Sequence, residues 1–198
     1  MTDTRERFLV AASKAFAERG FYGTSIAAIA ESLPYTKQAL LHHFGSKEKL
    51  YGEVLKRISD RLMHELDTAE ARAGDSASRL ETVFVEFYRA TIEHRDDTLL
   101  LMRELLDNRR RAETSRTWYL KPFLETLTDI VERDPRIRFR SRPAALAFVY
   151  QLLGAITYFA VSEPTLARMY GKKNFAVLQA GYESELRKLI SSRLEPST

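Results

Sequence analysis

The sequence contains no cysteine among its 198 residues. A chain without thiols has no disulfide framework, no thiolate nucleophile and no cysteine-based zinc site. Three motifs typical of enzymes are missing as well: the Gly-x-Ser-x-Gly elbow, the His-Glu-x-x-His zinc motif and the glycine-rich phosphate loop. We therefore expect no catalytic residues, no metal and no cofactor, and we expect that the protein is not an enzyme.

The chain also lacks internal repeats, low-complexity segments and any stretch that alternates polar with apolar residues, so no β-sheet is expected. Its first residues are charged and have none of the apolar core of a signal peptide, which favours a cytoplasmic protein. With 44% hydrophobic and 29% charged residues, the chain is long enough for one sizeable core or two small ones. These observations indicate a globular, all-α protein.

Positive charge is modest but unevenly placed along the chain, with a net charge of +4. Residues 1–57 carry nine lysines and arginines against six acidic residues, whereas residues 58–198 carry 22 against 21. The excess therefore lies mainly in the first third of the chain, as contact with nucleic acid phosphates would require.

Apolar residues recur at helical spacing over about residues 3–19 and predict a first helix. Gly20 is expected to end that helix in a left-handed conformation. Thr24 or Ser25 can cap a short second helix, and Pro34 ends it because proline cannot donate a backbone hydrogen bond.

Thr36 is a suitable cap for a third helix over about residues 37–43. A helix shorter than roughly 12 residues is marginal in water by itself, so neighbouring helices must hold it. Leu40 and Phe44 are the expected inward anchors. The opposite face carries hydrogen-bonding groups and one apolar side chain, which suit phosphates and base edges: Thr36, Lys37, Gln38, Leu41 and His42.

Two adjacent histidines, His42 and His43, raise the question of a metal site. Neighbouring residues on a helix point about 100° apart and cannot readily bind one ion. We therefore expect His42 to face outward, His43 to pack or hydrogen-bond inward, and no metal ion to bind.

The order of these elements resembles the N-terminal domain of TetR-type transcriptional repressors. The resemblance rests on a helix, a glycine, Thr24-Ser25-Ile26, a short helix and the stretch from His42 to Leu50, and it covers about residues 8–55 in detail. It implies an all-α fold, with a three-helix, helix-turn-helix DNA-binding domain at residues 1–46. Residues 47–198 are then a helical ligand-binding and dimerisation domain, joined to the first by a helix from residue 47 to about residue 73.

The resemblance also implies DNA contacts. Lys47 commonly contacts the DNA backbone in the family, and Thr24 or Ser25 has a similar role at a helix N-terminus. This chain departs from the family at Leu41, where a tyrosine that often touches a phosphate is usual, and at Pro34-Tyr35-Thr36, where Gly-Val-Ser or a similar turn is usual. Tyr35 or His42 is expected to supply the missing contact. The full expected set is Thr24, Ser25, Tyr35, Thr36, Lys37, Gln38, Leu41, His42 and Lys47.

Further helices are predicted over about residues 47–73, 76–94, 97–109, 116–133, 143–162 and 174–194, with a turn at Glu163-Pro164 and a short helical piece to Tyr170. Within them, the 18 residues from Ala144 to Val161 carry no charge, a length near the lower limit for crossing a bilayer. Such a helix also results when one side packs on its own core and the other on a partner subunit. We expect the second arrangement and no membrane.

A homodimer follows from the resemblance, because the family pairs its last two long helices with those of a second subunit. The expected interface residues are Phe148, Leu152, Ala155, Phe159, Phe175, Leu178, Tyr182 and Leu186. Two-fold symmetry then presents two recognition helices to an approximately palindromic operator in double-stranded DNA.

Aromatic and polar residues of the middle helices suit a small-molecule pocket: Phe84, Phe87, Tyr88, Arg103, Glu104, Trp118, Tyr119, Phe123, Phe148, Gln151 and Tyr158. The same aromatic residues also suit an ordinary core. In the family, a ligand in this domain tilts the linking helix and releases DNA. The sequence therefore favours a ligand-responsive repressor. The alternatives are a DNA-binding factor without small-molecule control and an all-α ligand carrier or enzyme.

Overall fold

The computed structural model describes residues 4–74, 78–107 and 119–194. These residues form helices, turns and loops and contain no strand, which confirms the predicted all-α fold. They fall into two compact units. The first unit comprises Met1–Arg61 with His94–Tyr119, and the second comprises Leu62–Glu93 with Leu120–Thr198.

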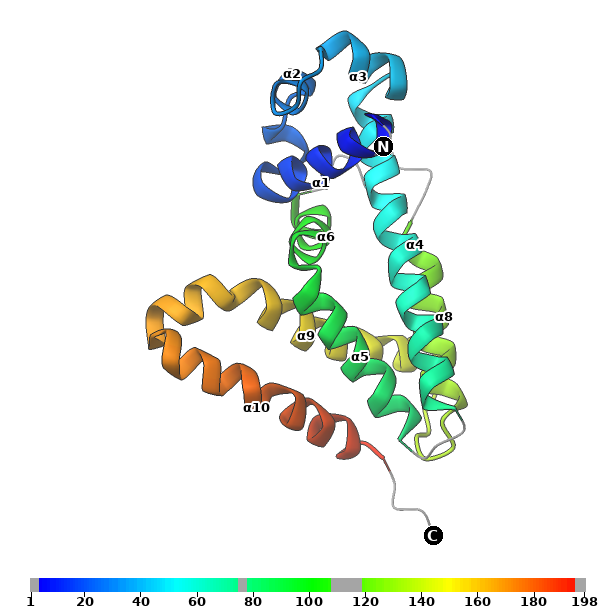
Figure 1. Ribbon diagram of the computed structural model, residues 1–198. Coiled ribbons are helices and arrows are strands. Elements are labelled where there is room, and N and C mark those ends of the chain that lie inside the picture. Colours follow the sequence, from blue (N-terminus) through cyan, green and yellow to red (C-terminus); the bar gives the residue numbers. More distant parts are fainter. Residues whose placement is uncertain (1–3, 75–77, 108–118, 195–198) are drawn as a thin grey trace. The chain divides into compact units, whose positions relative to one another are not determined.

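The first unit begins with three helices, α1 (Thr4–Gly23), α2 (Ile26–Glu31) and α3 (Lys37–Phe44) (Figure 1). Gly20 interrupts α1 with φ 69° and ψ 175°, a conformation that L side chains rarely adopt. The prediction that regular helix ends at Gly20 is thus confirmed, although a short helical turn follows it. α2 and α3 lie close to their predicted bounds.

Two further helices complete this unit: the first part of α4 (Lys47–Ala73) and α6 (Arg95–Asp107). Phe8, Phe16, Leu40 and Leu50 are fully buried at its core, and Phe44 is 4% exposed. The predicted inward anchors of the third helix are therefore confirmed. Since α3 has only two turns, this packing rather than its intrinsic stability holds it in place.

Polar contacts attach α6 to the other helices of the first unit. Arg103 donates hydrogen bonds to the carbonyls of Ala17 at 2.8 Å and Glu18 at 3.0 Å. The kink at Gly20 leaves carbonyls near it without their usual helical partners, and the guanidinium supplies donors for them. Arg61 forms an ion pair with Asp97. α6 is therefore fixed to α1 and to the first half of α4.

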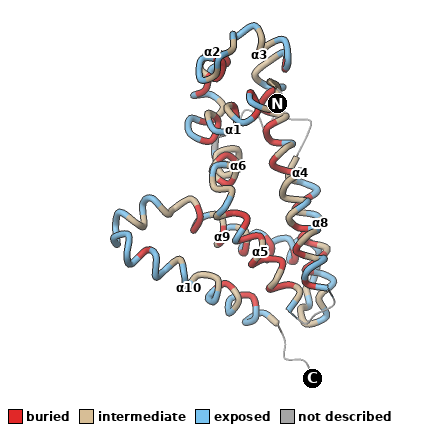
Figure 2. The backbone as a smooth tube through the Cα atoms, viewed as in Figure 1, coloured by how far each residue is buried: buried red, intermediate tan, exposed pale blue. Residues whose placement is uncertain are grey.

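The second unit contains the rest of α4 with α5 (Arg79–Glu93), α8 (Lys121–Arg133), α9 (Arg142–Tyr170) and α10 (Lys172–Ser191). One apolar cluster joins these five helices, with Phe84, Leu127, Leu152 and Ile156 almost completely buried. α9 and α10 form a hairpin whose turn, around Gly171, is exposed on every residue from 168 to 174 (Figure 2).

A largely buried charge cluster, with Glu81 buried and Asp134 and Arg136 half-buried, connects the start of α5 with the loop before α9. Arg136 donates to Asp134 at 2.7 Å and lies 3.4 Å from Glu81. The guanidinium of Arg136 lowers the pKa of the Asp134 carboxyl by hydrogen bonding, against the opposing effect of burial. The cluster thus fixes the loop on the face of α5.

The predicted turn at Glu163-Pro164 is wrong, because α9 continues through Pro164 to Tyr170. Proline removes one backbone hydrogen bond and crowds the preceding turn, which usually bends or ends a helix. Here both flanks pack on the core cluster, Phe159 before the proline and Leu166 after it. Tertiary packing therefore outweighs the local preference.

The remaining helices differ from their predicted bounds by a few residues at their ends, as is usual where helix ends fray. The predicted starts at residues 76 and 116 and the predicted end at residue 109 lie outside the described residues. α10 ends three residues before the predicted Leu194.

Among the described residues, α9 is the one helix that is long and apolar enough to cross a membrane. A single helix of this kind is weak support for a membrane span, since core helices pass the same test. In this structure, Leu152 and Ile156 of α9 belong to the core of the second unit. This agrees with the expectation of a helix that packs on its own core.

Candidate nucleic-acid interface

α2, a tight turn and α3 form the predicted helix-turn-helix. Ser25 caps α2 by accepting a hydrogen bond from the amide of Ala28 at 3.0 Å, and Thr36 caps α3 by accepting one from the amide of Ala39 at 3.1 Å. Pro34 stands in the turn between them, where a missing amide hydrogen has no helical role. Both short helices thus begin at hydroxyl caps, as the sequence predicts.

Thr24 has a structural role that the sequence did not reveal. Its side chain is 2% exposed, and its hydroxyl donates to the carbonyls of Ala15 at 3.0 Å and Gly20 at 2.8 Å. A buried hydroxyl that bonds to α1 has no access to a DNA phosphate. The expectation of a contact from Thr24 is therefore corrected, and exposed Ser25 is left as the candidate at this helix N-terminus.

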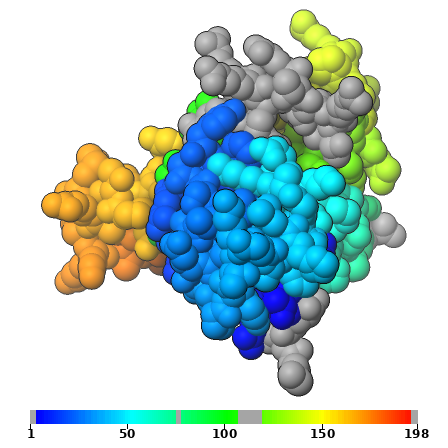
Figure 3. Space-filling model, turned by 90° about the horizontal axis from the view of Figure 1, so that it is seen from above, coloured from blue at the N-terminus to red at the C-terminus, as the bar shows by residue number. Residues whose placement is uncertain are grey.

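The outward face of α3 is open to solvent. Thr36, Lys37, Gln38 and His42 are exposed and Leu41 is half-buried. The blue and cyan atoms of the first helices form one continuous surface when viewed from the α2 and α3 side (Figure 3). All five residues belong to α3 or are its cap, and their contact with DNA stays a prediction.

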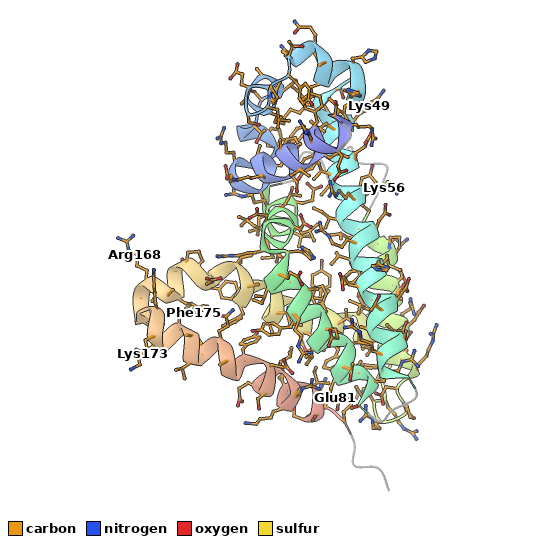
Figure 4. The ribbon with its side chains drawn as sticks, in the orientation of Figure 1. Lys49, Lys56, Glu81, Arg168, Lys173 and Phe175 are labelled. Carbon is orange, nitrogen blue, oxygen red and sulfur yellow. The ribbon has the colours of Figure 1, made fainter. Side chains whose placement is uncertain are left out.

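Lys47 lies at the start of α4 as predicted, but its ammonium group is engaged. Its Nζ lies 4.4 Å from the centroid of the Phe21 ring, a cation–π contact. Burial lowers the pKa of Lys47, and the nearby Glu48 carboxylate opposes that change. Lys47 is half-buried beside this ring, whereas Lys49 of the same turn is exposed (Figure 4).

The expectation that His43 packs inward is wrong. His43 is exposed, and its ring touches the fully buried Phe8 at a centroid distance of 5.8 Å. The Phe44 side chain occupies the inward direction at this end of α3, so the imidazole covers the edge of the core instead. No group of three or more metal-binding side chains occurs within the described part of the chain.

Tyr35 precedes the cap of α3 and packs against α1. Its ring centroid lies 5.1 Å from that of Phe8. Its hydroxyl lies 3.4 Å from the hydroxyl of Thr4 and 3.5 Å from a guanidinium nitrogen of Arg7. Sequence reasoning missed Arg7, because its place beside α3 depends on how α1 packs. The sequence did hold a signal for Arg7: it is a basic residue directly before Phe8, and the helical spacing already predicts that Phe8 faces inward.

The predicted ligand-pocket residues do not lie in one place. Phe84, Phe87, Tyr88, Phe123 and Phe148 belong to the apolar cluster of the second unit. Gln151 and Tyr158 are exposed on α9.

The other predicted pocket residues belong to the first unit or are not described. Arg103 binds α1, and Glu104 accepts a hydrogen bond of 2.6 Å from the Tyr51 hydroxyl. The Tyr119 carbonyl accepts one of 2.5 Å from Ser59. Trp118 lies outside the described residues. Five aromatic residues of the second unit therefore remain as pocket candidates, since residue type alone could not assign each side chain to a unit.

The predicted dimer interface also needs correction. Five of its residues are buried in the core of the second unit: Phe148, Leu152, Phe159, Phe175 and Leu186. Tyr182 and Ala155 are half-buried and bond to each other, hydroxyl to carbonyl, at 2.7 Å. Leu178 alone of the set is exposed, at 46%. A helix that is apolar all round does not reveal which side faces its own core.

With Leu178, seven large apolar residues of α9 and α10 that were not predicted for the interface are exposed: Leu146, Tyr150, Tyr158, Met169, Tyr170, Val177 and Leu189. We call this set the α9–α10 apolar surface. It continues to the turn of the hairpin, where Arg168 and Lys173 point outward and Phe175 points into the unit (Figure 4).

Comparisons with known proteins agree with this geometry. The sequence model of the family described as "Bacterial regulatory proteins, tetR family" matches residues 8–54, the segment that contains α2, the turn and α3. The transcriptional activator FasR of Mycolicibacterium smegmatis is 30% identical over 152 residues, which are 74% of this chain and 68% of FasR. The chain belongs to the tetR family. It is a DNA-binding transcriptional regulator.

Two other known regulators match almost the whole chain. The repressor KstR2 of Mycobacterium tuberculosis is 24% identical over 190 residues, which cover 91% of this chain and 94% of KstR2. The structure of FadR of Bacillus subtilis in complex with stearoyl-CoA has a TM-score of 0.69 at 15% identity, covering 96% of this chain and 98% of FadR. The likeness to FadR shows the shared fold.

Proposed function

We propose that this tetR-family protein is a dimeric repressor that binds an approximately palindromic operator and is released from it by a small molecule. The observation that carries the proposal is the exposed face of α3, which Leu40 and Phe44 hold in place from behind. KstR2, which is named a repressor, matches nearly the whole chain and favours repression. FasR, which is named an activator, keeps activation as the alternative.

The direct DNA contacts are proposed to come from α3 and the helix N-termini around it. Lys37 and Lys47 would bind phosphates, and Gln38 and His42 would reach base edges in the major groove. Ser25 would add a phosphate contact at the N-terminus of α2. Tyr35, Thr36 and Leu41 complete the proposed surface.

The α9–α10 apolar surface supports the proposal of a dimer. Monomeric proteins rarely expose large contiguous apolar patches, and such a patch marks a site of association. A two-fold axis through α9 and α10 would present two copies of α3 to two half-sites. The spacing between half-sites would then be close to one helical turn of DNA or a multiple of it.

Control by a small molecule is proposed to act through α4. This helix is continuous from Lys47 to Ala73, so it begins at the proposed DNA surface and ends in the second unit. A ligand with higher affinity for one orientation of α4 would shift the population away from the DNA-binding state. The aromatic cluster that contains Phe84, Tyr88 and Phe123 favours an apolar effector. Among structural relatives, FadR is an example of a regulator in complex with a molecule that carries a long apolar chain, stearoyl-CoA.

We also propose the division into a DNA-binding domain at residues 1–46 and a regulatory and dimerisation domain at residues 47–198. The protein would act in the cytoplasm without catalysis, metal or cofactor. A DNA-binding factor without small-molecule control is the second candidate, because core packing alone also explains the aromatic cluster.

Selection of bound sequences from a random pool of duplex DNA tests the proposal. The selected duplex is then used to measure affinity at two salt concentrations. A two-fold symmetric consensus with salt-sensitive binding is expected. No enrichment over the starting pool would contradict the proposal, and a consensus without symmetry would contradict the dimer. Acyl-CoA thioesters added to the complex then test release by an apolar effector.

A further inference from the structure

Arg7 stands beside the N-terminal end of α3. Its Nη1 atom lies 3.5 Å from the Tyr35 hydroxyl, and Tyr35 immediately precedes the cap residue Thr36. Tyr35 is held by its ring contact with Phe8 and by the Thr4 hydroxyl, 3.4 Å away. In a helix-turn-helix, the N-terminal residues of the second helix contact base edges. Arg7 therefore lies near the end of α3 that contacts bases.

Within the part of the chain that the structure describes, no carboxylate neutralises the charge of Arg7. Two nearby arginines, in contrast, form ion pairs with carboxylates. Arg5 pairs with Glu53, and Arg57 pairs with Glu6 at 2.6 Å. Arg7 is exposed and has no acidic partner among residues 4–74, 78–107 and 119–194. A phosphate could therefore bind Arg7 without displacing a carboxylate of these described residues.

The width of the major groove favours a phosphate as the partner of Arg7. The groove is about 12 Å wide, and an α-helix with its side chains has a diameter of about 10–12 Å. A helix in the groove therefore has backbone phosphates along both sides. α1 packs against α3 through Phe8 and Phe44, whose ring centroids are 6.3 Å apart. The first turns of α1 thus flank the helix that enters the groove.

We propose that Arg7 binds a DNA backbone phosphate at the edge of the groove that receives α3, and that the Tyr35 hydroxyl positions its guanidinium. The proposal rests on the DNA-binding function proposed above and adds α1 to the surface. It supplies a phosphate contact that the aliphatic Leu41 cannot make. Because phosphates carry no sequence information, this contact strengthens binding to every duplex alike.

The test compares Arg7→Gln with Lys14→Gln in the full-length protein. Lys14 is exposed on α1 seven residues further along, so both variants remove one positive charge from the same helix. Affinity is measured for the selected duplex and for an unrelated duplex of equal length, over a series of salt concentrations. Arg7→Gln is expected to weaken binding to both duplexes roughly tenfold and to lower the salt slope by about 2 per dimer. Lys14→Gln is expected to leave affinity and slope close to those of the unchanged protein.

Two more variants separate the phosphate contact from a structural role. Arg7→Lys keeps the charge and should preserve the salt slope. Tyr35→Phe removes the hydroxyl that is proposed to position Arg7. This change should weaken DNA binding more in the unchanged protein than in the Arg7→Gln variant. Circular dichroism and thermal unfolding confirm that each variant folds.

The outcomes distinguish this inference from the proposed function. Sequence-selective binding with an unchanged salt slope in Arg7→Gln overturns the Arg7 contact alone, as does an equal effect of Lys14→Gln. Failure of the unchanged protein to select any sequence overturns the operator proposal. In that case, the affinity and salt slope of Arg7→Gln on the unrelated duplex still test the Arg7 contact, because phosphate contacts do not depend on sequence.

Discussion

The Tyr51 hydroxyl of α4 donates a hydrogen bond of 2.6 Å to the Glu104 carboxylate of α6. Tyr51 is 2% exposed, and its ring packs on Phe16 at a centroid distance of 4.8 Å. A hydrogen bond to a charged group in such surroundings is stronger than one between neutral groups. The pair therefore fixes α6 to the first half of α4 within the first unit.

Tyr51→Phe is expected to lower the free energy of unfolding by about 1.5–3 kcal/mol, because it removes the hydrogen bond from the Tyr51 hydroxyl to the Glu104 carboxylate. Thermal or urea unfolding measures the change. Tyr22→Phe is the matched control, since Tyr22 is 57% exposed and its hydroxyl has no hydrogen-bond partner within the described residues. Equal stability of Tyr51→Phe and the unchanged protein would show that the hydrogen bond contributes nothing.

Lys37→Ala and Lys47→Ala are expected to weaken DNA binding without unfolding the protein, because each removes a proposed phosphate contact. Each should lower the salt slope by about 1 per protomer in binding titrations. Lys56→Ala serves as the control, since Lys56 is exposed on α4 and already pairs with Asp60 at 2.6 Å (Figure 4). Unchanged affinity in both Lys37→Ala and Lys47→Ala would count against the assigned surface.

Thr24→Val and Ser25→Ala should separate stability from DNA binding. Thr24→Val removes a buried donor from the carbonyls of Ala15 and Gly20 and is expected to cost about 1–3 kcal/mol of unfolding free energy. Ser25→Ala removes the cap of α2 at a cost of about 1 kcal/mol and should also weaken DNA binding. Chemical unfolding and DNA titration of the two variants provide the comparison. A folded Thr24→Val variant with a reduced salt slope would contradict the structural role of Thr24.

Acid is expected to destabilise the second unit through Asp134. Its pKa is lowered in the folded protein, chiefly by hydrogen bonding to Arg136, so its contribution is fully present above the unfolded pKa of about 3.9. The contribution is lost as the pH falls through the lowered folded value. Asp134→Asn should remove this part of the pH dependence. Unfolding measured from pH 6 down to about pH 3 tests it, and parallel curves for both proteins would contradict the assignment.

Tyr158→Arg and Leu152→Ala test which face of α9 pairs with a partner. Tyr158 is 69% exposed, so a charge there should produce a folded monomer. Leu152 is 1% exposed, so its truncation should instead cost about 2–5 kcal/mol of unfolding free energy. Sedimentation and thermal unfolding distinguish the two effects. A dimer that persists in Tyr158→Arg would exclude this part of the α9–α10 apolar surface from the interface.

Local signals in the sequence were sufficient for most of the helix-turn-helix. Hydroxyl caps at Ser25 and Thr36, the break at Gly20 and the inward Leu40 all depend on residues within a few positions of each other. Backbone preferences and helical spacing determine such features before any distant contact forms. The sequence alone also determined the all-α class, since no segment alternates at the period of a strand.

Tertiary structure decided what helical spacing leaves open. α9 is apolar on every side, so only the packing of α5, α8 and α10 decides that Leu152 faces the core and Tyr158 faces solvent. The same packing carries α9 through Pro164. Thr24 is buried and Arg7 stands beside α3 because α1 folds against both. Contacts between residues far apart in the chain choose among faces that local patterns cannot distinguish, because an exposed and a buried side of such a helix have the same composition.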